Sequence, residues 1–264
     1  MKFIIDHDLH IHSQISTCSR DPEQNNERIL QYAIDNGFNT ICLTDHLWDS
    51  DVEGADCWYK PQNYDHIAQA KPLPQAEGVR FLFGCEVELD KHFTLGLSPE
   101  KYDLFDFIII PTTHLHMKGM TISEEDAATP AGRAKVWLQR LDAVLNMDLP
   151  FEKVGIAHLT TTLIAPTKEE YWQAMEMLPE DELVRLFTKA AKLGVGIELN
   201  ATSLHFSDEE ADKALRVFKI AKQCGCKFYC GSDAHHPERF EVVKPRLERV
   251  VDFLGLTEDD KFKI

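Results

Sequence analysis

The sequence predicts an α/β fold in which a parallel sheet closes into a barrel or a near-barrel. Seven apolar runs of strand length alternate with amphipathic segments of helix length along the 264 residues. Strands that are apolar throughout are typical of parallel sheets buried on both faces. A chain of this length is ordinary for one α/β barrel, so we expect residues 1–264 to form a single domain.

The elements follow one another in a regular order. Strands are expected at residues 1–9, 40–44, 79–85, 107–111, 154–157, 195–199 and 228–231. The first helix is expected to begin at Asp21-Pro22, an N-cap followed by a favoured N1 proline, and to stop at Gly37. Further helices are expected at 131–146, from about 181 to Gly194, from the Ser207–Glu210 capping box to Gly225, and at 245–254.

Composition excludes several classes of protein. The formal net charge of −16 repels phosphate backbones, so we expect no broad nucleic-acid surface. A small phosphorylated substrate is still possible, because bound metal ions can reverse the local electrostatic field. The apolar runs are too short to span a bilayer, and the N-terminus lacks a secretion-signal pattern. Seven cysteines without a C-x-x-C pair indicate reduced thiols and a cytoplasmic location. The oligomeric state stays open.

Imidazoles and carboxylates follow nearly every expected strand, and these groups bind Zn, Mn or Fe. The carboxyl ends of parallel strands meet at one face, so side chains at those positions converge. The residues are His10, His12, Asp45, His46, Glu86, Glu88, His114, His116, His158, Glu198, Asn200, Asp233 and His235. Each alone has an ordinary interpretation, such as a surface histidine or a helix cap. Their repetition at one topological position predicts a metal site.

The combination of His10-x-His12, Thr44-Asp45-His46, Gly84-x-Glu86, His158 and Gly231-Ser232-Asp233-x-His235 resembles the PHP (polymerase and histidinol phosphatase) family. The resemblance covers essentially the whole chain, with the motifs in the family's order. It implies a distorted seven-stranded, TIM-barrel-like (β/α) barrel with the metal site at the carboxyl ends of the strands. Carried over by motif, it implies that the metal ligands are His10, His12, His46, Glu86, His114, His158, Asp233 and His235. Glu86 would bridge two ions, and His46 would bind a third.

One position departs from the family pattern. Many members have a further histidine six residues after the opening motif, and this sequence has Cys18 there. Because a thiolate is a good zinc ligand, we expect Cys18 to bind the third ion; the alternative is that this ion is weakly bound or absent. His114 and His116 lie two residues apart, and alignment with the family favours His114 as the ligand.

The resemblance implies a metal-dependent phosphoesterase of the histidinol-phosphatase branch, acting on a phosphomonoester of a small metabolite. Two or three divalent transition-metal ions (Zn, Mn or Fe) would activate a bridging hydroxide that attacks phosphorus in line. We expect catalytic roles for Glu86, Asp233 and His235. We expect substrate-binding roles for Arg20, His116, His205 and His236. The long connections 48–78 and 159–180 are expected to cover the site, and the sequence does not name the substrate.

Two other functions stay open. A metal-dependent amidohydrolase acting on a C–N bond uses similar ligands on a similar barrel. Its usual strand-end lysine, which can be carbamylated to bridge metal ions, has no counterpart here. A non-catalytic, metal-stabilised regulatory module is the second alternative, and the intact set of ligand residues argues against it.

Overall fold

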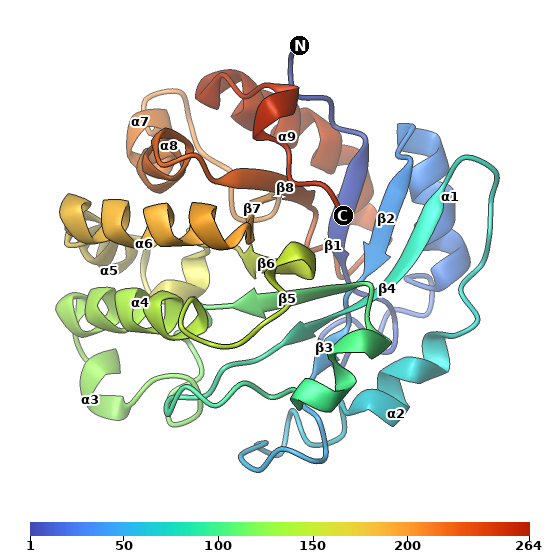
Figure 1. Ribbon diagram of the computed structural model, residues 1–264, viewed down its shortest axis with the longest axis horizontal. Helices are drawn as coiled ribbons and strands as arrows, with labels where there is room; N and C mark the ends of the chain where they lie inside the picture. The colour runs from blue at the N-terminus through green and yellow to red at the C-terminus, as the bar shows by residue number, and fades with distance from the viewer.

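The computed structural model describes residues 1–264 and shows a nearly closed barrel of parallel strands surrounded by helices (Figure 1). Neighbouring strands around the sheet are β1 (His7–Ile11), β2 (Thr40–Leu43), β4 (Arg80–Val87), β5 (Phe107–Pro111), β6 (Val154–Ala157), β7 (Gly196–Asn200) and β8 (Lys227–Gly231). Every pairing is parallel, and the two-residue β3 (His46–Leu47) pairs with β4 outside this path. The expected barrel fold is confirmed.

The barrel is joined at the seam between β1 and β8 mainly by contacts beyond the regular ladder. Ile11 and Ala234 form an isolated parallel bridge. Side chains complete the seam: the Ser232 hydroxyl donates to the His10 carbonyl (3.0 Å), and the Ser232 N–H donates to Asp8 Oδ1 (2.9 Å). The first and last strands therefore meet most closely at their carboxyl ends, where His10 and the segment after β8 lie.

Helices cover the outside of the barrel. They are α1 (Asn26–Asn36), α2 (Tyr64–Ile67), α3 (Glu124–Ala127), α4 (Pro130–Val144), α5 (Lys168–Glu176), α6 (Glu180–Leu193), α7 (Ala211–Ala214), α8 (Arg216–Gln223) and α9 (Phe240–Leu254). Short 3-10 turns occur at η1 (Ala68–Ala70), η2 (Pro99–Leu104), η3 (Phe151–Lys153), η4 (Thr162–Ile164), η5 (Pro237–Arg239) and η6 (Glu258–Asp260). None of the helices combines the length and the apolarity needed to cross a membrane.

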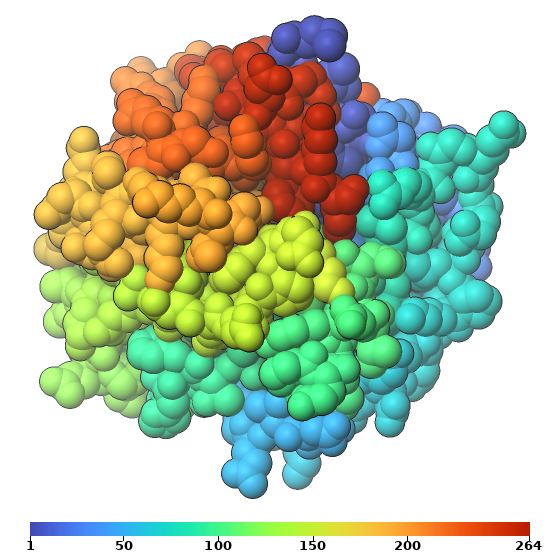
Figure 2. All heavy atoms as spheres, viewed as in Figure 1, coloured from blue at the N-terminus to red at the C-terminus, as the bar shows by residue number.

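Two apolar clusters stabilise the barrel. The larger one contains 71 buried residues and includes the strand side chains that face the helices. The smaller one contains seven buried residues, among them Phe107, Tyr229 and Phe262. Strand side chains alternate between two faces, so this second set points into the barrel. Phe262 belongs to the C-terminal segment, which lies beside the N-terminal residues (Figure 2) and bonds to them through the Glu258 N–H and the Met1 carbonyl.

Several element boundaries differ from the sequence expectation. The first strand begins at His7, and α1 begins at Asn26 behind the N-cap Asn25, whose side chain accepts from the Arg28 N–H. Asp21 instead accepts from the Glu23 N–H in a turn, because Asn25 provides a competing cap closer to the apolar stripe. The closing helix begins at Phe240, with Pro245 inside it.

The connection 159–180 contains a helix that the sequence analysis missed. Here α5 is capped by Thr167, whose hydroxyl accepts from the Glu170 N–H. The reciprocal hydrogen bonds of Ser207 and Glu210 form as expected, but α7 begins only at Ala211, and α8 follows after an interruption at Leu215. These two connections lie at the carboxyl ends of β6 and β7, and both contribute walls to a cavity described below.

We predict that packing within the barrel makes Gly155 intolerant of a side chain. A Cβ there would lie 2.6 Å from the Tyr229 hydroxyl and 2.7 Å from Phe107 Cζ. Gly155→Ala should lower the free energy of unfolding by roughly 1–3 kcal/mol, the usual cost of overpacking, as measured by urea denaturation. In a Tyr229→Phe background the cost should be smaller, because one clashing atom is gone. Unchanged stability in the single variant would contradict this packing.

Candidate metal centre

The nine metal-ligand candidates converge at the carboxyl end of the barrel. They are His10, His12, Cys18, His46, Glu86, His114, His158, Asp233 and His235. His46 begins β3, and the others lie at or after the carboxyl ends of β1, β4, β5, β6 and β8. All but Cys18, Asp233 and His235 are buried throughout. The structure therefore brings together side chains that are separated by more than two hundred positions in the chain.

The Glu86 carboxylate lies at the middle of the cluster, with each oxygen facing its own imidazoles. Its Oε2 lies 2.9 Å from His46 Nδ1, 3.3 Å from His12 Nε2 and 3.7 Å from His10 Nε2. Its Oε1 lies 3.2 Å from His158 Nε2 and 4.0 Å from His114 Nε2. One carboxylate thus belongs to two separate groups of potential ligands, one with His10 and His12 and one with His114 and His158.

Asp233 forms the second carboxylate of the cluster. Its Oδ1 lies 3.4 Å from His12 Nε2, 3.6 Å from His10 Nε2 and 3.6 Å from His235 Nδ1. Asp233 and His158 both have positive φ, at 52° and 28°. Non-glycine residues adopt this left-handed conformation at an energetic cost, and such residues concentrate at functional sites. From these turns, Asp233 reaches His12 and His158 reaches Glu86.

The polar atoms of the cluster are better placed to bind metal ions than to hydrogen-bond to one another. Glu86 and Asp233 have no lysine or arginine partner, so imidazoles are the only groups beside them that can carry a positive charge. His46 Nδ1 and Glu86 Oε2 are close, yet both are buried without an aligned hydrogen bond. His10 Nε2 and His12 Nε2 also face each other at 3.1 Å. Lone pairs that converge in this way are the donor set of zinc, manganese and iron sites.

Charges within the cluster keep its carboxylates ionised. Burial raises the pKa of Glu86, but the charges of His46 and His10 hold that pKa well below its usual range. Burial lowers the pKa of His12, and its contacts with Asp233 and Glu86 raise it to about 9. Burial and the charge of His12 lower the pKa of His235 to about 3. Ionised carboxylates and a neutral His235 are in the protonation states that metal binding requires.

Cys18 lies at the outer side of the cluster. Its sulfur and the nitrogens of His12, His46 and His235 form a group whose members all lie within 4.8 Å of one another. Burial together with the negative charges of Glu86 and Asp233 raises the pKa of the thiol. Cys18 is a free cysteine, and the residue is exposed to solvent. This placement is the one expected for a ligand of a third ion.

Buried carboxylates orient the imidazoles. Glu88 Oε2 lies 2.8 Å from His114 Nδ1, and because an ionised carboxylate only accepts, Nδ1–H donates and Nε2 is left facing Glu86. Glu198 Oε1 orients His10 through Nδ1 (2.7 Å) in the same way. Such hydrogen bonds fix the tautomer and direction of a metal-binding histidine. Glu88 and Glu198 were open candidates in the sequence, and the structure places both behind the imidazoles.

Arg140 supports Glu88, and the sequence analysis missed it. The guanidinium of Arg140 is fully buried and donates to Glu88 Oε1 (2.8 Å). It also donates to backbone carbonyls that include those of Thr112 and Leu89. A signal existed in the sequence, because Arg140 lies beside Leu141 on the apolar stripe of the expected helix. A charged residue on such a stripe is costly to bury unless it has a specific partner.

A cavity of about 600 Å³ opens onto the cluster. Its apolar walls are formed by Trp58, Met117, Met120 and Leu163. Lys118 is the lysine that lines the cavity. Of the four substrate-binding candidates, His116 lines this cavity. Arg20 lies outside it, His236 is exposed and faces Asp21 (3.3 Å), and His205 lines a second cavity. The connections 48–78 and 159–180 both reach the site, through Trp58 and Leu163.

We predict that gently purified protein carries two or three equivalents of divalent transition metal and that Cys18 holds one of them. Cys18→Ala should lower the content by up to one equivalent, because a single thiolate contributes to the outermost group only. Cys57→Ala is the matched control, since Cys57 is an exposed free thiol outside the cavity. Elemental analysis measures the content. Metal-free wild-type protein, or a full complement in Cys18→Ala, would contradict this assignment.

We predict that Glu88→Gln weakens metal binding by about 10–100-fold, the usual effect of losing an outer hydrogen-bond partner of a ligand. An amide has one accepting oxygen, so it cannot serve both the Arg140 guanidinium and the His114 Nδ1–H. Competition with a chelator measures the affinity, and circular dichroism checks the fold. Glu77→Gln, at an exposed position, should bind metal normally. Equal affinity in both variants would exclude an orienting role for Glu88.

Comparison with known proteins identifies the family. No curated protein matches the sequence. Histidinol phosphate phosphatase from Lactococcus lactis subsp. lactis Il1403, solved with zinc, L-histidinol and phosphate, is similar in structure with a TM-score of 0.65. The similarity covers 98% of this chain and 99% of that one at 17% sequence identity, so it shows the fold alone. The PHP domain family matches residues 8–202, and the chain therefore belongs to that family.

Proposed function

We propose that the protein is a metal-dependent phosphoesterase that hydrolyses a phosphomonoester of a small metabolite. The observation that carries this proposal is the position of Glu86, whose two oxygens face two different groups of imidazoles. A carboxylate so placed is suited to bridge two metal ions. Paired ions of this kind are used by phosphatases to hold both the attacking and the leaving oxygen of an in-line displacement.

Two comparisons support the proposal. The chain belongs to the PHP domain family, and the structural neighbour from Lactococcus lactis was solved with zinc, L-histidinol and phosphate. The neighbour's ligands favour a small phosphorylated metabolite as the substrate class here. The donor set of imidazoles, carboxylates and one thiol favours zinc, manganese or iron over magnesium or calcium.

Each residue of the cluster has a proposed role in binding or orienting the metal ions. His10, His12, His114, His158 and Asp233 would hold two ions on either side of Glu86, while His46, His235 and Cys18 would hold a third. Bound there, the ions supply Lewis acidity and activate water for attack on phosphorus. Glu86 fixes the separation of the two inner groups, because both depend on one carboxylate. Glu88 and Glu198 keep the nitrogens of His114 and His10 directed at that centre.

Substrate contacts would come from the cavity walls. Lys118 is an exposed cation at the opening and is suited to a phosphate oxygen. His116 lines the cavity, its ring lies 5.5 Å from that of His114, and the residue is exposed. A neutral imidazole donates one hydrogen bond, which suits a phosphate oxygen. We assign His116 to orientation of the phosphate.

We further propose that residues 1–264 form one cytoplasmic domain. One apolar cluster extends from Phe3 to Leu256, and the last residues seal the barrel interior through Phe262. Free thiols, two of them exposed, are in keeping with a reducing compartment. The net charge of −16 argues against a broad nucleic-acid surface.

We predict that Glu86→Ala abolishes phosphatase turnover and lowers metal content, because both inner ion positions lose their shared ligand. His46→Ala should reduce turnover less, since one imidazole of the outer group is lost. Glu100→Ala, at an exposed position, is the control. Steady-state rates on a panel of phosphorylated metabolites, with metal stoichiometry, measure the effect. Near-normal turnover in Glu86→Ala would refute the mechanism, and turnover of amides without phosphate esters would favour an amidohydrolase.

A further inference from the structure

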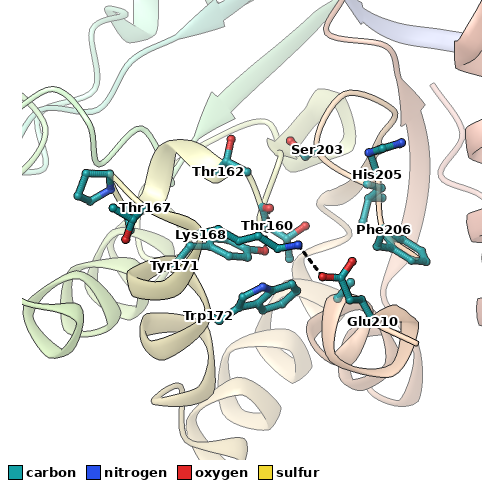
Figure 3. A pocket seen from close by; sticks show the side chains of 14 residues that line it. Thr160, Thr162, Thr167, Lys168, Tyr171, Trp172, Ser203, His205, Phe206 and Glu210 are labelled. Atoms are coloured by element: carbon teal, nitrogen blue, oxygen red, sulfur yellow. Dashed lines mark hydrogen bonds and ion pairs between the residues drawn. The ribbon is translucent and has the colours of Figure 1, made fainter. Parts of the chain in front are cut away.

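A second cavity lies beside the metal centre, between α5 and the segment that follows β7. Its volume is about 370 Å³, which is within the range of small-molecule sites. Thr167, Lys168 and Trp172 form one wall, and His205 and Glu210 form the other (Figure 3). None of its lining residues belongs to the cavity over the metal cluster.

The turn η4 separates the two cavities. Thr162 lines the second cavity, whereas its neighbour Leu163 lines the cavity over the cluster. Both sites therefore lie at the same end of the barrel, yet each has its own set of side chains. A molecule in the second cavity would face this turn from the opposite side to a substrate at the metal centre.

An ion pair joins the two walls of the second cavity. Lys168 Nζ on α5 lies 2.6 Å from Glu210 Oε1, across the opening (Figure 3). The side chain of Lys168 is 70% exposed and that of Glu210 is 32% exposed. Ion pairs this open to solvent contribute little to stability, so separating this one costs little. The cavity thus has one positive and one negative group, on opposite walls, that a ligand can bind.

Other lining groups have hydrogen-bonding capacity that the protein does not use. The hydroxyls of Thr160 and Ser203 and the imidazole of His205 form no hydrogen bond within the chain, although the Thr160 carbonyl and the Ser203 N–H do. Trp172 and Phe206 supply aromatic surface on the two sides (Figure 3). Apolar walls with a few convergent polar groups are typical of small-molecule sites.

We propose that this cavity binds a small zwitterion, a free α-amino acid with an apolar or aromatic side chain. Its carboxylate would pair with Lys168 and its ammonium with Glu210, while the side chain would pack between Trp172 and Phe206. A ligand with only a negative charge would be repelled by Glu210, and one with only a positive charge would be repelled by Lys168. A ligand that carries both charges close together can form charge-assisted hydrogen bonds with Lys168 and Glu210 at the same time.

The cavity lies next to turns that also reach the metal centre. Thr160 follows the His158 turn, in which the His158 carbonyl accepts from the Thr161 N–H. Ser203 is held by Asn200, whose side-chain amide also donates to Asp233 Oδ2 (3.4 Å). A bound amino acid would therefore contact the two turns that carry or support residues of the metal cluster. The cavity is therefore a binding site separate from the substrate pocket.

Isothermal titration of the metal-loaded protein tests the proposal without reference to phosphatase activity. L-Phenylalanine, L-leucine and L-methionine are the probes, with 2-phenylethylamine and 3-phenylpropionate as analogues that carry one charge each. At least one amino acid should bind, and each analogue should bind at least about tenfold more weakly than L-phenylalanine. Glycine chelates metal ions as other amino acids do but lacks the side chain, so it should also bind more weakly.

Variants locate the binding. Lys168→Ala and Glu210→Gln should each weaken amino-acid binding by about tenfold or more, since each removes one charged partner. Lys219→Ala is the matched control, because it breaks a comparable exposed ion pair with Asp212 (2.6 Å) outside the cavity. Absence of binding by all three amino acids, equal binding of a single-charge analogue, or unchanged binding in both cavity variants would overturn the proposal. The first of these results would leave the phosphoesterase proposal untouched.

Discussion

The Glu86 carboxylate is the constraint on which the rest of the site depends. It is buried at the end of β4, with imidazoles on both sides and no lysine or arginine in contact. An ionised carboxylate in such a place is costly unless cations neutralise it. The imidazoles cannot do this and also act as ligands, because a metal ligand must be neutral. Metal ions would neutralise the Glu86 charge and leave the imidazoles neutral. The other strand ends place their side chains around this carboxylate.

The barrel makes this arrangement stable. Parallel strands place every strand end on one face, and the β1–β8 seam is completed by Ser232 and Asp8 next to His10. Arg140 and Glu88 extend the support from α4 to His114 through a fully buried ion pair. Buried charges of this kind contribute little net stability, but they fix geometry when every hydrogen bond is satisfied. The supported metal cluster and the second cavity lie at the same end of the barrel.

Much of this could be read from the sequence, for identifiable reasons. The strands were found because their apolar runs are continuous, and the site emerged because His and Glu residues recur at strand ends. Boundaries were less predictable: Asn25 displaced Asp21 as the cap of α1, and Pro245 lies inside α9. The helix α5 was missed because its apolar face is short. The placements of Arg20, His205 and His236 depend on loop paths, which no local pattern in the sequence specifies.

Anomalous diffraction from metal-loaded crystals would show directly whether Glu86 bridges two ions. Two anomalous peaks are expected beside Glu86, separated by roughly 3.5–4 Å, as in two-metal phosphatases. One oxygen of Glu86 should contact the ion beside His10 and His12, and the other should contact the ion beside His114 and His158. A single ion beside Glu86, or two ions with Glu86 bound to neither or to only one, would exclude a bridging role for this carboxylate.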